Sequence, residues 1–97
     1  MDGATLDASS NLHDAHRHSA NHRDEVLASE VCGCFYCCDT FAPGEIREWV
    51  DQVESGRPPQ TALCPRCGID SVLGSASGFP VAREFLASMR TRYFGAF

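Results

Sequence analysis

The chain has 97 residues, of which 43% are hydrophobic and 22% are charged, and its formal net charge is −5 at neutral pH. This length fits one small domain, and no apolar run approaches the roughly 18 residues of a membrane-spanning helix. All 8 basic residues are arginines, against 13 acidic residues. The acidic balance disfavours a protein whose affinity depends on the phosphate backbone of a nucleic acid.

Residues 1–20 are polar and show no hydrophobic periodicity, which predicts a disordered N-terminal tail before a single folded domain over residues 21–97. No apolar run of the signal-peptide type is present in this segment, so we expect no secretory leader. The segment and the residues just after it contain four histidines: His13, His16, His18 and His22. Such tracts can bind metal, but we interpret this one as an incidental cluster in a solvated tail.

Three short helices are predicted, over residues 21–30, 43–53 and 80–93. The middle helix has the clearest pattern, because Pro43 suits a first helical position and the apolar residues after it repeat at helical spacing. Those apolar residues are Ile46, Trp49, Val50 and Val53. The last helix has an apolar face formed by Val81, Phe85, Leu86, Met89 and Tyr93.

Two short strands are predicted on either side of the second cysteine pair, over residues 61–63 and 69–73. The first leads into Cys64-Pro65-Arg66-Cys67-Gly68, and the second is rich in β-branched residues and ends at Gly74. We expect the two strands to form a hairpin with the cysteine turn at its tip. In this loop Pro65 restricts the turn, and Gly68 provides the positive φ that such turns require.

Two C-x-x-C pairs, Cys34/Cys37 and Cys64/Cys67, are separated by residues 38–63. This arrangement is typical of a four-cysteine metal site, most often zinc. A domain of roughly this size buries only about 60% of its unfolded surface, and a structural zinc ion contributes about 10–16 kcal/mol of folding free energy. We therefore predict one structural Zn²⁺ ion, with iron as the less favoured metal, and the four cysteines as its ligands.

The first cysteine pair is ambiguous, because Cys32, Cys34, Cys37 and Cys38 lie within seven positions. Cys34 and Cys37 have the common two-residue spacing, whereas replacement of one of them by Cys32 or Cys38 gives less usual spacings; this alternative stays open. We interpret Cys32 and Cys38 as small, partly buried thiols, or as a spare pair that exchanges with the ligands under oxidation. Their crowding disfavours a disulfide framework and indicates a reducing cytoplasm.

The fold expected from these elements is small α+β, with a zinc-ribbon or rubredoxin-like two-knuckle metal site and about three short helices. A treble clef is disfavoured because its second cysteine pair opens a helix, whereas a strand is predicted after Cys67. The nucleases built on that fold also need a histidine at the site, and every histidine here precedes residue 23. No nucleophile and base pair is visible outside the cysteines, so no enzyme is predicted.

The cysteine loops are similar to those of rubredoxins, in which two C-x-x-C-G knuckles hold iron. The resemblance covers Cys64-Pro65-Arg66-Cys67-Gly68, but Cys38 stands where a rubredoxin has glycine. Residues 38–63 between the pairs also carry the predicted middle helix. These departures favour zinc over iron.

The run Thr-Ala-Leu-Cys-Pro-Arg-Cys-Gly-Ile-Asp-Ser-Val-Leu-Gly over residues 61–74, preceded by Cys34-Phe35-Tyr36-Cys37 and by Ile-Arg-Glu-Trp at 46–49, resembles a family of small uncharacterised bacterial proteins. The resemblance covers about residues 21–97. It implies a cytoplasmic zinc-ribbon-like module, and it implies no activity.

Together these observations predict a non-catalytic cytoplasmic zinc-binding module that acts through a protein partner. The alternatives are a nucleic-acid-binding zinc ribbon that uses Arg83, Arg90 and Arg92, and a thiol or zinc redox sensor. We expect Asp70 and Ser71 to cap the hairpin or to bond to the cysteine turn. Trp49 is expected in the core, or else as an exposed anchor for a partner.

Overall fold

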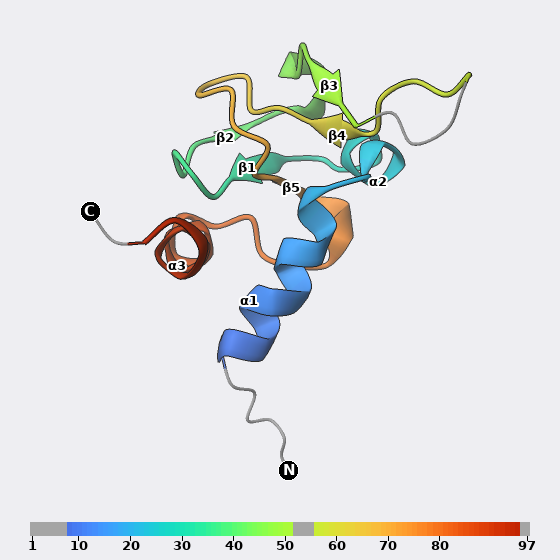
Figure 1. The fold of residues 1–97 in the computed structure, drawn as a ribbon. Coiled ribbons are helices and arrows are strands. Elements are labelled where there is room, and N and C mark those ends of the chain that lie inside the picture. Colours follow the sequence, from blue (N-terminus) through green and yellow to red (C-terminus); the bar gives the residue numbers. More distant parts are fainter. Residues whose placement is uncertain (1–7, 52–55, 96–97) are drawn as a thin grey trace.

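The computed structural model describes residues 8–51 and 56–95 of the chain. This part is a small α+β structure with three α-helices and five short strands (Figure 1). The helices are α1 (Ala8–His16), α2 (Arg23–Leu27) and α3 (Arg83–Phe94). The strands are β1 (Cys32–Cys34), β2 (Thr40–Phe41), β3 (Trp49–Val50), β4 (Thr61–Ala62) and β5 (Val72–Gly74). Single 3₁₀ turns cover Arg17–Ser19, Pro43–Glu45 and Ser75–Ser77.

The strands form two antiparallel sheets that bring the cysteine loops together. One sheet has the order β2-β1-β5, and the other pairs β3 with β4. In the first sheet Cys34 lies opposite Val72, which places the end of β1 beside the residues that follow the second cysteine pair. Gly33 lies at the centre of β1, where a Cβ atom would be only 2.7 Å from Val81 Cγ1, so a glycine there lets the segment that leads into α3 approach the sheet.

The predicted hairpin over residues 61–63 and 69–73 is wrong. Strand β4 pairs with β3, and β5 pairs with β1. The two segments are joined only at the base of the cysteine loop, where the Cys64 amide donates to the Ile69 carbonyl at 2.9 Å. Each segment instead pairs with a strand further away in the sequence. Strand β1, the partner of β5, precedes the first cysteine loop, and strand β3, the partner of β4, follows it.

The predicted helix over residues 43–53 is also wrong. Only Pro43–Glu45 form a helical turn, and Trp49–Val50 form strand β3; residues 52–55 lie outside the described part. Ile46 and Trp49 pack against the buried cluster that contains the cysteines, and the Leu63 amide donates to the Glu48 carbonyl at 3.0 Å. The same apolar spacing is also compatible with an extended backbone. In that conformation, hydrogen bonds and packing contacts with neighbouring segments replace the hydrogen bonds within a helix.

Residues 8–20 were predicted as part of a disordered tail, but the structure has α1 and a 3₁₀ turn there. Ala15 is fully buried, the His16 ring stacks on Tyr93 at 4.1 Å, and the Tyr93 hydroxyl donates to the Leu12 carbonyl at 3.3 Å. A nine-residue helix of this composition is marginal alone, so its contacts with α3 hold it. Residues 1–7 lie outside the described part.

The other two predicted helices are confirmed with changed ends. Helix α2 is shorter than predicted, since it covers only Arg23–Leu27, and it buries Val26 while leaving Leu27 exposed. Helix α3 begins three residues later than predicted and ends one residue later. Its Leu86 and Met89 are fully buried. None of the helices in the described ranges is long and apolar enough to cross a membrane.

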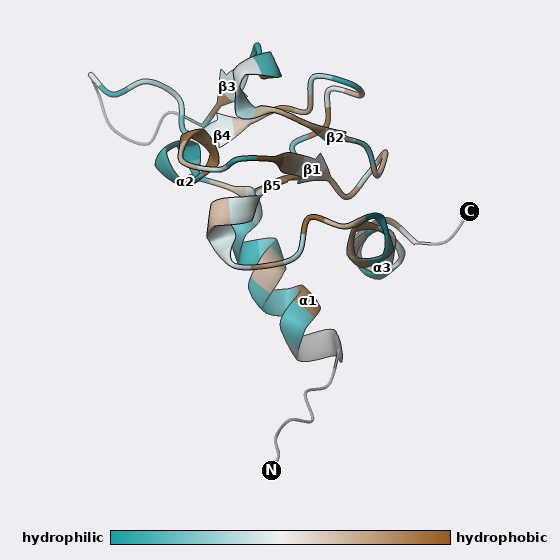
Figure 2. Cartoon of the chain, turned by 180° about the vertical axis from the view of Figure 1, so that it is seen from behind, coloured by the Kyte–Doolittle hydropathy of each residue, from teal (hydrophilic) through white to brown (hydrophobic). Residues whose placement is uncertain are grey.

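Two buried clusters lie on opposite faces of the central sheet, and Figure 2 shows the hydrophobic stretches on β1 and β5 between them. Successive side chains along a strand point to opposite faces of the sheet. Cys34 and Val72 therefore lie in one cluster, and the residues that follow them, Phe35 and Leu73, lie in the other. The first cluster holds Cys64 together with Val26 and strand residues. The second is closed by α1 and α3. Both C-x-x-C pairs therefore lie on one face of the sheet, and two helices cover the other.

Candidate metal centre

The first cysteine loop is a tight turn at the end of β1. The Cys34 amide donates to the Asp39 carbonyl at 3.0 Å, and the Cys38 amide donates to the Cys34 carbonyl at 2.8 Å. To close this turn, Cys38 takes a positive φ of 64°, a conformation that favours glycine.

The second cysteine loop repeats this hydrogen-bond pattern. The Cys64 amide donates to the Ile69 carbonyl at 2.9 Å, and the Gly68 amide donates to the Cys64 carbonyl at 2.9 Å. Gly68 has a φ of 83°, so it stands where Cys38 stands in the first loop. Both loops are therefore the same type of knuckle, although only one has glycine at its left-handed position.

In each knuckle the backbone directs amide groups at the sulfur of the first cysteine. The Cys34 sulfur accepts hydrogen bonds from the amides of Tyr36 at 3.3 Å and Cys37 at 3.5 Å. The Cys64 sulfur accepts them from Arg66 at 3.2 Å and Cys67 at 3.4 Å. Such donors stabilise a thiolate and hold it in a fixed position.

The four sulfur atoms of Cys34, Cys37, Cys64 and Cys67 lie within 4.8 Å of one another. Cys34 and Cys67 are 3.6 Å apart at their sulfurs, and Cys37 and Cys64 are 3.8 Å apart. A tetrahedron with metal–sulfur bonds of about 2.3 Å has edges of about 3.8 Å. These four cysteines could therefore hold one metal ion.

Within residues 8–51 and 56–95, no other group of three or more histidine, cysteine or acidic side chains is arranged to bind a metal. Cys32 and Cys38 lie outside the sulfur cluster, and Cys38 packs into the second hydrophobic cluster on the other face of the sheet. The cluster therefore contains the C-x-x-C pair Cys34/Cys37, and not one of the alternative spacings.

Ser71 contacts the cluster from β5. Its hydroxyl lies 3.0 Å from the Cys34 sulfur, and its side chain is almost fully buried. The Phe35 amide donates to the Ser71 carbonyl at 3.0 Å, which fixes the residue against the first knuckle. The contact agrees with the predicted bond to a cysteine turn, although it reaches across to the other knuckle. Asp70 is exposed.

The thiols of the cluster have unequal pKa values. Burial acts to raise the pKa of Cys34, but the hydrogen bonds from Ser71 and the two backbone amides outweigh it, so the pKa is lowered. Burial raises the pKa of Cys37 to about 11, and it also raises that of Cys67. A bound cation would supply the positive charge that lets all four sulfurs ionise together.

The first knuckle also anchors α3. The Arg90 guanidinium donates to the Tyr36 carbonyl and lies over the Tyr36 ring, 4.5 Å from its centre. The edge of the Tyr36 ring meets Phe94 at 4.8 Å, and Phe35 lies 6.2 Å from Tyr93. The two residues between the first cysteines thus connect the sulfur cluster to the C-terminal helix.

The second knuckle is tied to the segments before it by Arg66. Its guanidinium lies 2.9 Å from a Glu45 carboxylate oxygen and 4.0 Å from one of Asp39. The Ala42 amide, with help from Arg66, lowers the pKa of Glu45. Because these groups are exposed, their ion pairs contribute little to the free energy of folding, and their main effect is to orient the loop.

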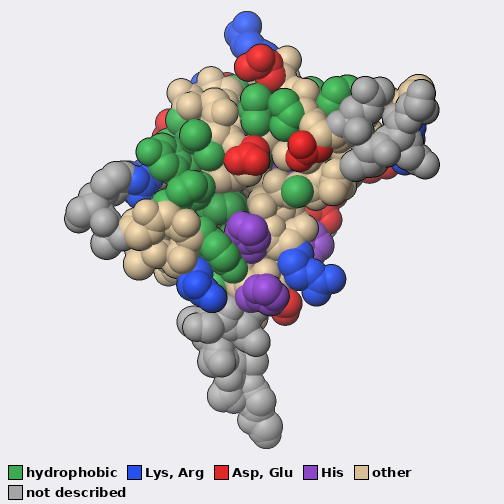
Figure 3. All heavy atoms as spheres, viewed as in Figure 1, with side chains coloured by type: hydrophobic (Ala, Val, Ile, Leu, Met, Phe, Trp, Pro, Cys, Tyr) green, Lys and Arg blue, Asp and Glu red, His purple; other side chains and the backbone are tan. Residues whose placement is uncertain are grey.

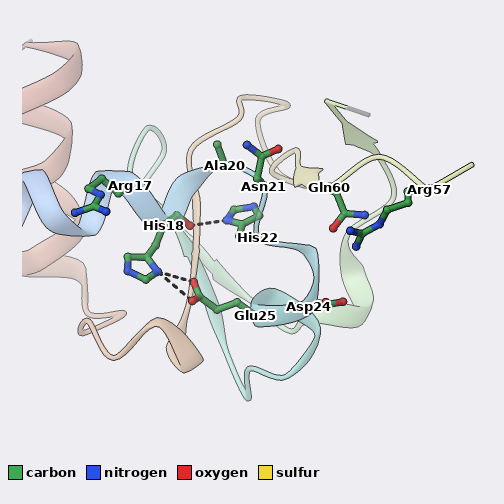
Figure 4. Close-up of a pocket in the computed structure, with 9 residues that line it drawn as sticks. All are labelled: Arg17, His18, Ala20, Asn21, His22, Asp24, Glu25, Arg57 and Gln60. Atoms are coloured by element: carbon green, nitrogen blue, oxygen red, sulfur yellow. Dashed lines mark hydrogen bonds and ion pairs between the residues drawn. The ribbon is translucent and has the colours of Figure 1, made fainter. Parts of the chain in front are cut away.

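His18 and His22 hold the N-terminal segment to the fold (Figure 4), and neither belongs to the group of four sulfurs. His18 Nδ1 lies 3.0 Å from the Glu25 carboxylate. The buried His22 ring donates from Nδ1 to the His18 carbonyl at 2.5 Å and accepts from the Ala62 amide at Nε2, at 3.1 Å. Sequence analysis missed this role, because its signal is a buried imidazole that only the fold reveals. These side chains line an open pocket of about 460 Å³.

Trp49 is half-buried against the cluster that contains the cysteines, and Arg23 lies over its ring at 4.5 Å. This position agrees with the predicted core role.

No protein-family model matches this chain, and neither does any curated protein or any solved structure. The class of protein is therefore defined by the fold and the site alone. It is a small α+β protein in which two cysteine knuckles bring together four sulfurs that could hold a metal ion.

Proposed function

We propose that the protein is a non-catalytic zinc-binding module in which one Zn²⁺ ion joins the two knuckles and stabilises the fold. The observation that carries the proposal is the cluster of four sulfurs within 4.8 Å of one another, in which two separations, 3.6 and 3.8 Å, are close to the edge of a zinc–sulfur tetrahedron. Four protein ligands fill a tetrahedral shell, so no position is left for a substrate. Zinc is preferred over iron because Cys38 replaces the glycine of the rubredoxin-type knuckle, and the cytoplasm is the proposed location because it keeps the thiols reduced.

Metal analysis combined with chelation tests this proposal. The purified protein is expected to contain one zinc ion per chain, and a strong chelator is expected to unfold it, since the metal provides much of the folding free energy. Replacement of Cys34, Cys37, Cys64 or Cys67 by serine should abolish stoichiometric metal. Cys32→Ser and Cys38→Ser are the matched controls and should retain it. A fold that persists without metal in the chelator would refute the proposal.

A protein partner is the proposed target of the module, and the C-terminal end of α3 is the proposed contact. Phe94 is 44% exposed although it packs on the first knuckle, and Figure 3 shows hydrophobic side chains gathered beside α3 on that face. Phe94→Ser should weaken capture of a partner while metal content is unchanged. Equal capture by the variant and the native protein would place the contact elsewhere.

Nucleic acid is a less favoured target. Arg90, one of the three arginines considered for phosphate contacts, is engaged with Tyr36 inside the fold, and the net charge of −5 opposes binding. A gel shift of labelled single-stranded and double-stranded DNA and RNA at low salt tests this alternative. Binding that weakens steeply with salt would favour nucleic acid over a protein partner.

A further inference from the structure

The two cysteines of each pair have different surroundings. Cys34 is fully buried and Cys64 is 3% exposed, whereas Cys37 and Cys67 are half-buried. The first cysteine of each pair accepts two backbone amide hydrogen bonds, and Cys34 also has the Ser71 hydroxyl. The cluster therefore has a buried, strongly hydrogen-bonded half and a more exposed half.

This difference affects reactivity as well as stability. A hydrogen bond to a thiolate withdraws negative charge from the sulfur and reduces its nucleophilicity, and burial blocks the approach of a reagent. When a bound metal ion keeps all four sulfurs ionised, the thiolates that face solvent are the ones that electrophiles and oxidants reach first. In this protein those conditions meet at Cys37 and Cys67, one from each knuckle.

We propose that Cys37 and Cys67 are the oxidant-reactive thiolates of the metal centre, and that a peroxide converts the cluster into disulfides that join the two knuckles. This inference rests on the proposed metal-binding function. Sulfurs of different knuckles lie side by side, at 3.6 Å between Cys34 and Cys67 and 3.8 Å between Cys37 and Cys64. Each exposed cysteine thus has a buried cysteine of the other knuckle beside it.

The chemistry proceeds in two steps. The Cys37 or Cys67 thiolate attacks one oxygen of hydrogen peroxide, the O–O bond breaks, and the products are a sulfenic acid and hydroxide. The neighbouring Cys64 or Cys34 thiolate then attacks the sulfenic sulfur, forms the S–S bond and expels a second hydroxide. Two thiolates lose two electrons in total, and one peroxide gains them. Each disulfide removes two ligands from the metal, so oxidation is coupled to metal release.

The remaining cysteines do not provide this reactivity. Cys32 is fully buried in β1. Cys38 is half-buried like Cys37 and Cys67, but it packs against the second hydrophobic cluster and does not belong to the group of four sulfurs. The sensor alternative considered in the sequence analysis used these two as the exchanging pair. The inference assigns the reaction to half-exposed members of the cluster instead.

Thiol labelling of the full-length, zinc-loaded protein tests which sulfurs react. After zinc content is measured, the protein is treated for short times with N-ethylmaleimide, and the modified cysteines are identified by mass spectrometry. Cys37 and Cys67 are expected to react at least about tenfold faster than Cys34 and Cys64. Equal rates, or faster reaction of the buried pair, would overturn the inference.

Peroxide treatment of the same protein tests the product. We expect release of zinc to a chromogenic chelator, disulfides Cys37–Cys64 and Cys34–Cys67 in the peptide map, and recovery of zinc binding after reduction by a thiol. The double variant Cys32→Ser/Cys38→Ser should behave as the native protein does. Loss of the response in that variant, or disulfides within a C-x-x-C pair, would contradict the inference. A protein that binds no metal at the start would refute the proposed function itself, a result distinguishable from zinc-loaded protein with the wrong reactivity.

Discussion

At the scale of single residues, the left-handed position of each knuckle decides how well the turn closes. Gly68 and Cys38 have φ values of 83° and 64° and donate equivalent amide hydrogen bonds. A side chain in this conformation brings Cβ close to the following carbonyl. The first knuckle accepts that cost at Cys38, while the second avoids it.

Gly68→Ala is expected to lower the free energy of unfolding of the zinc-loaded protein by about 1–2 kcal/mol. No atom lies within 4 Å of the added Cβ, so the effect would come from the backbone alone. Gly44→Ala is the matched control, because Gly44 has the same free space without a positive φ. Chemical denaturation of both variants measures the difference, and equal stabilities would contradict the assignment of strain to Gly68.

Ser71 is expected to position the Cys34 sulfur for metal binding. Ser71→Ala removes the hydroxyl at 3.0 Å, and loss of such a supporting contact typically reduces metal affinity by about 10- to 100-fold. Competition with a chelator of known affinity measures the change. Ser88→Ala is the control, since the exposed Ser88 hydroxyl bonds only to the Glu84 carbonyl in its own helix. Unchanged affinity in Ser71→Ala would show that the hydroxyl has no role at the centre.

At the scale of secondary structure, the elements depend on the knuckles more than on their own propensities. Helix α3 is attached to the first knuckle through Arg90, whose guanidinium donates to the Tyr36 carbonyl and covers the Tyr36 ring. Helix α1 is attached in turn through the stack of His16 on Tyr93. The first knuckle therefore holds α3 in place, and α3 in turn holds α1.

Arg90→Leu should loosen α3 while metal stoichiometry is retained. The variant loses a charged hydrogen bond and a cation–π contact, which together are expected to cost about 2–3 kcal/mol. Amide hydrogen exchange of residues 83–94 is the measurement, and protection should fall there before it falls in β1 and β5. Arg92→Leu serves as the control, because the exposed Arg92 lies only over Tyr93 at 5.2 Å. Equal protection in the two variants would contradict the attachment through Arg90.

At the scale of the whole molecule, His22 joins the N-terminal segment to the strand that leads into the second knuckle. The His22 amide donates to the Gln60 carbonyl at 2.8 Å, and the ring bonds to His18 on one side and to Ala62 on the other. Burial lowers the pKa of His22 below 6.5, and the hydrogen bond to the His18 carbonyl and the nearby Glu25 carboxylate only partly oppose this effect. Only a neutral ring can accept the Ala62 amide hydrogen bond.

The depressed pKa predicts a loss of stability in mild acid. The unfolded chain takes up a proton near pH 6.5 and the folded chain only at lower pH, so the stabilisation is complete above that value and falls as the pH drops through the folded-state pKa. Denaturation of zinc-saturated protein between pH 7.5 and 5.5 should show a slope of up to about 1.4 kcal/mol per pH unit from this group. Cysteine protonation adds to the slope in every variant.

His22→Asn separates the two contributions to this slope. Its pH dependence should be shallower than that of the native protein, even though the variant is less stable at every pH. His13→Asn, at an exposed position, should leave the native slope unchanged. The same slope in His22→Asn and in the native protein would contradict the assignment to His22.

Elements that depend on neighbouring residues alone are predictable from the amino-acid sequence. The spacing in Cys64-Pro65-Arg66-Cys67-Gly68 predicts a knuckle without reference to the rest of the chain, and the apolar face of residues 80–93 predicts a helix close to the observed α3. The selection of Cys34 and Cys37 among four crowded cysteines also followed from spacing alone, and the structure brings these two into the cluster.

Features that depend on residues far apart in the chain are not predictable from local sequence. The apolar spacing of residues 46–50 fits a helix as well as an extended segment, and the pairing of β3 with β4 selected the extended form. Helix α1 exists because α3 covers it, and Ser71 meets Cys34 because β5 pairs with β1. In a chain this short, the free energy of each weak element comes mainly from contacts between segments. The two knuckles determine which segments come together and therefore which of these contacts form. A pattern within one segment cannot predict them.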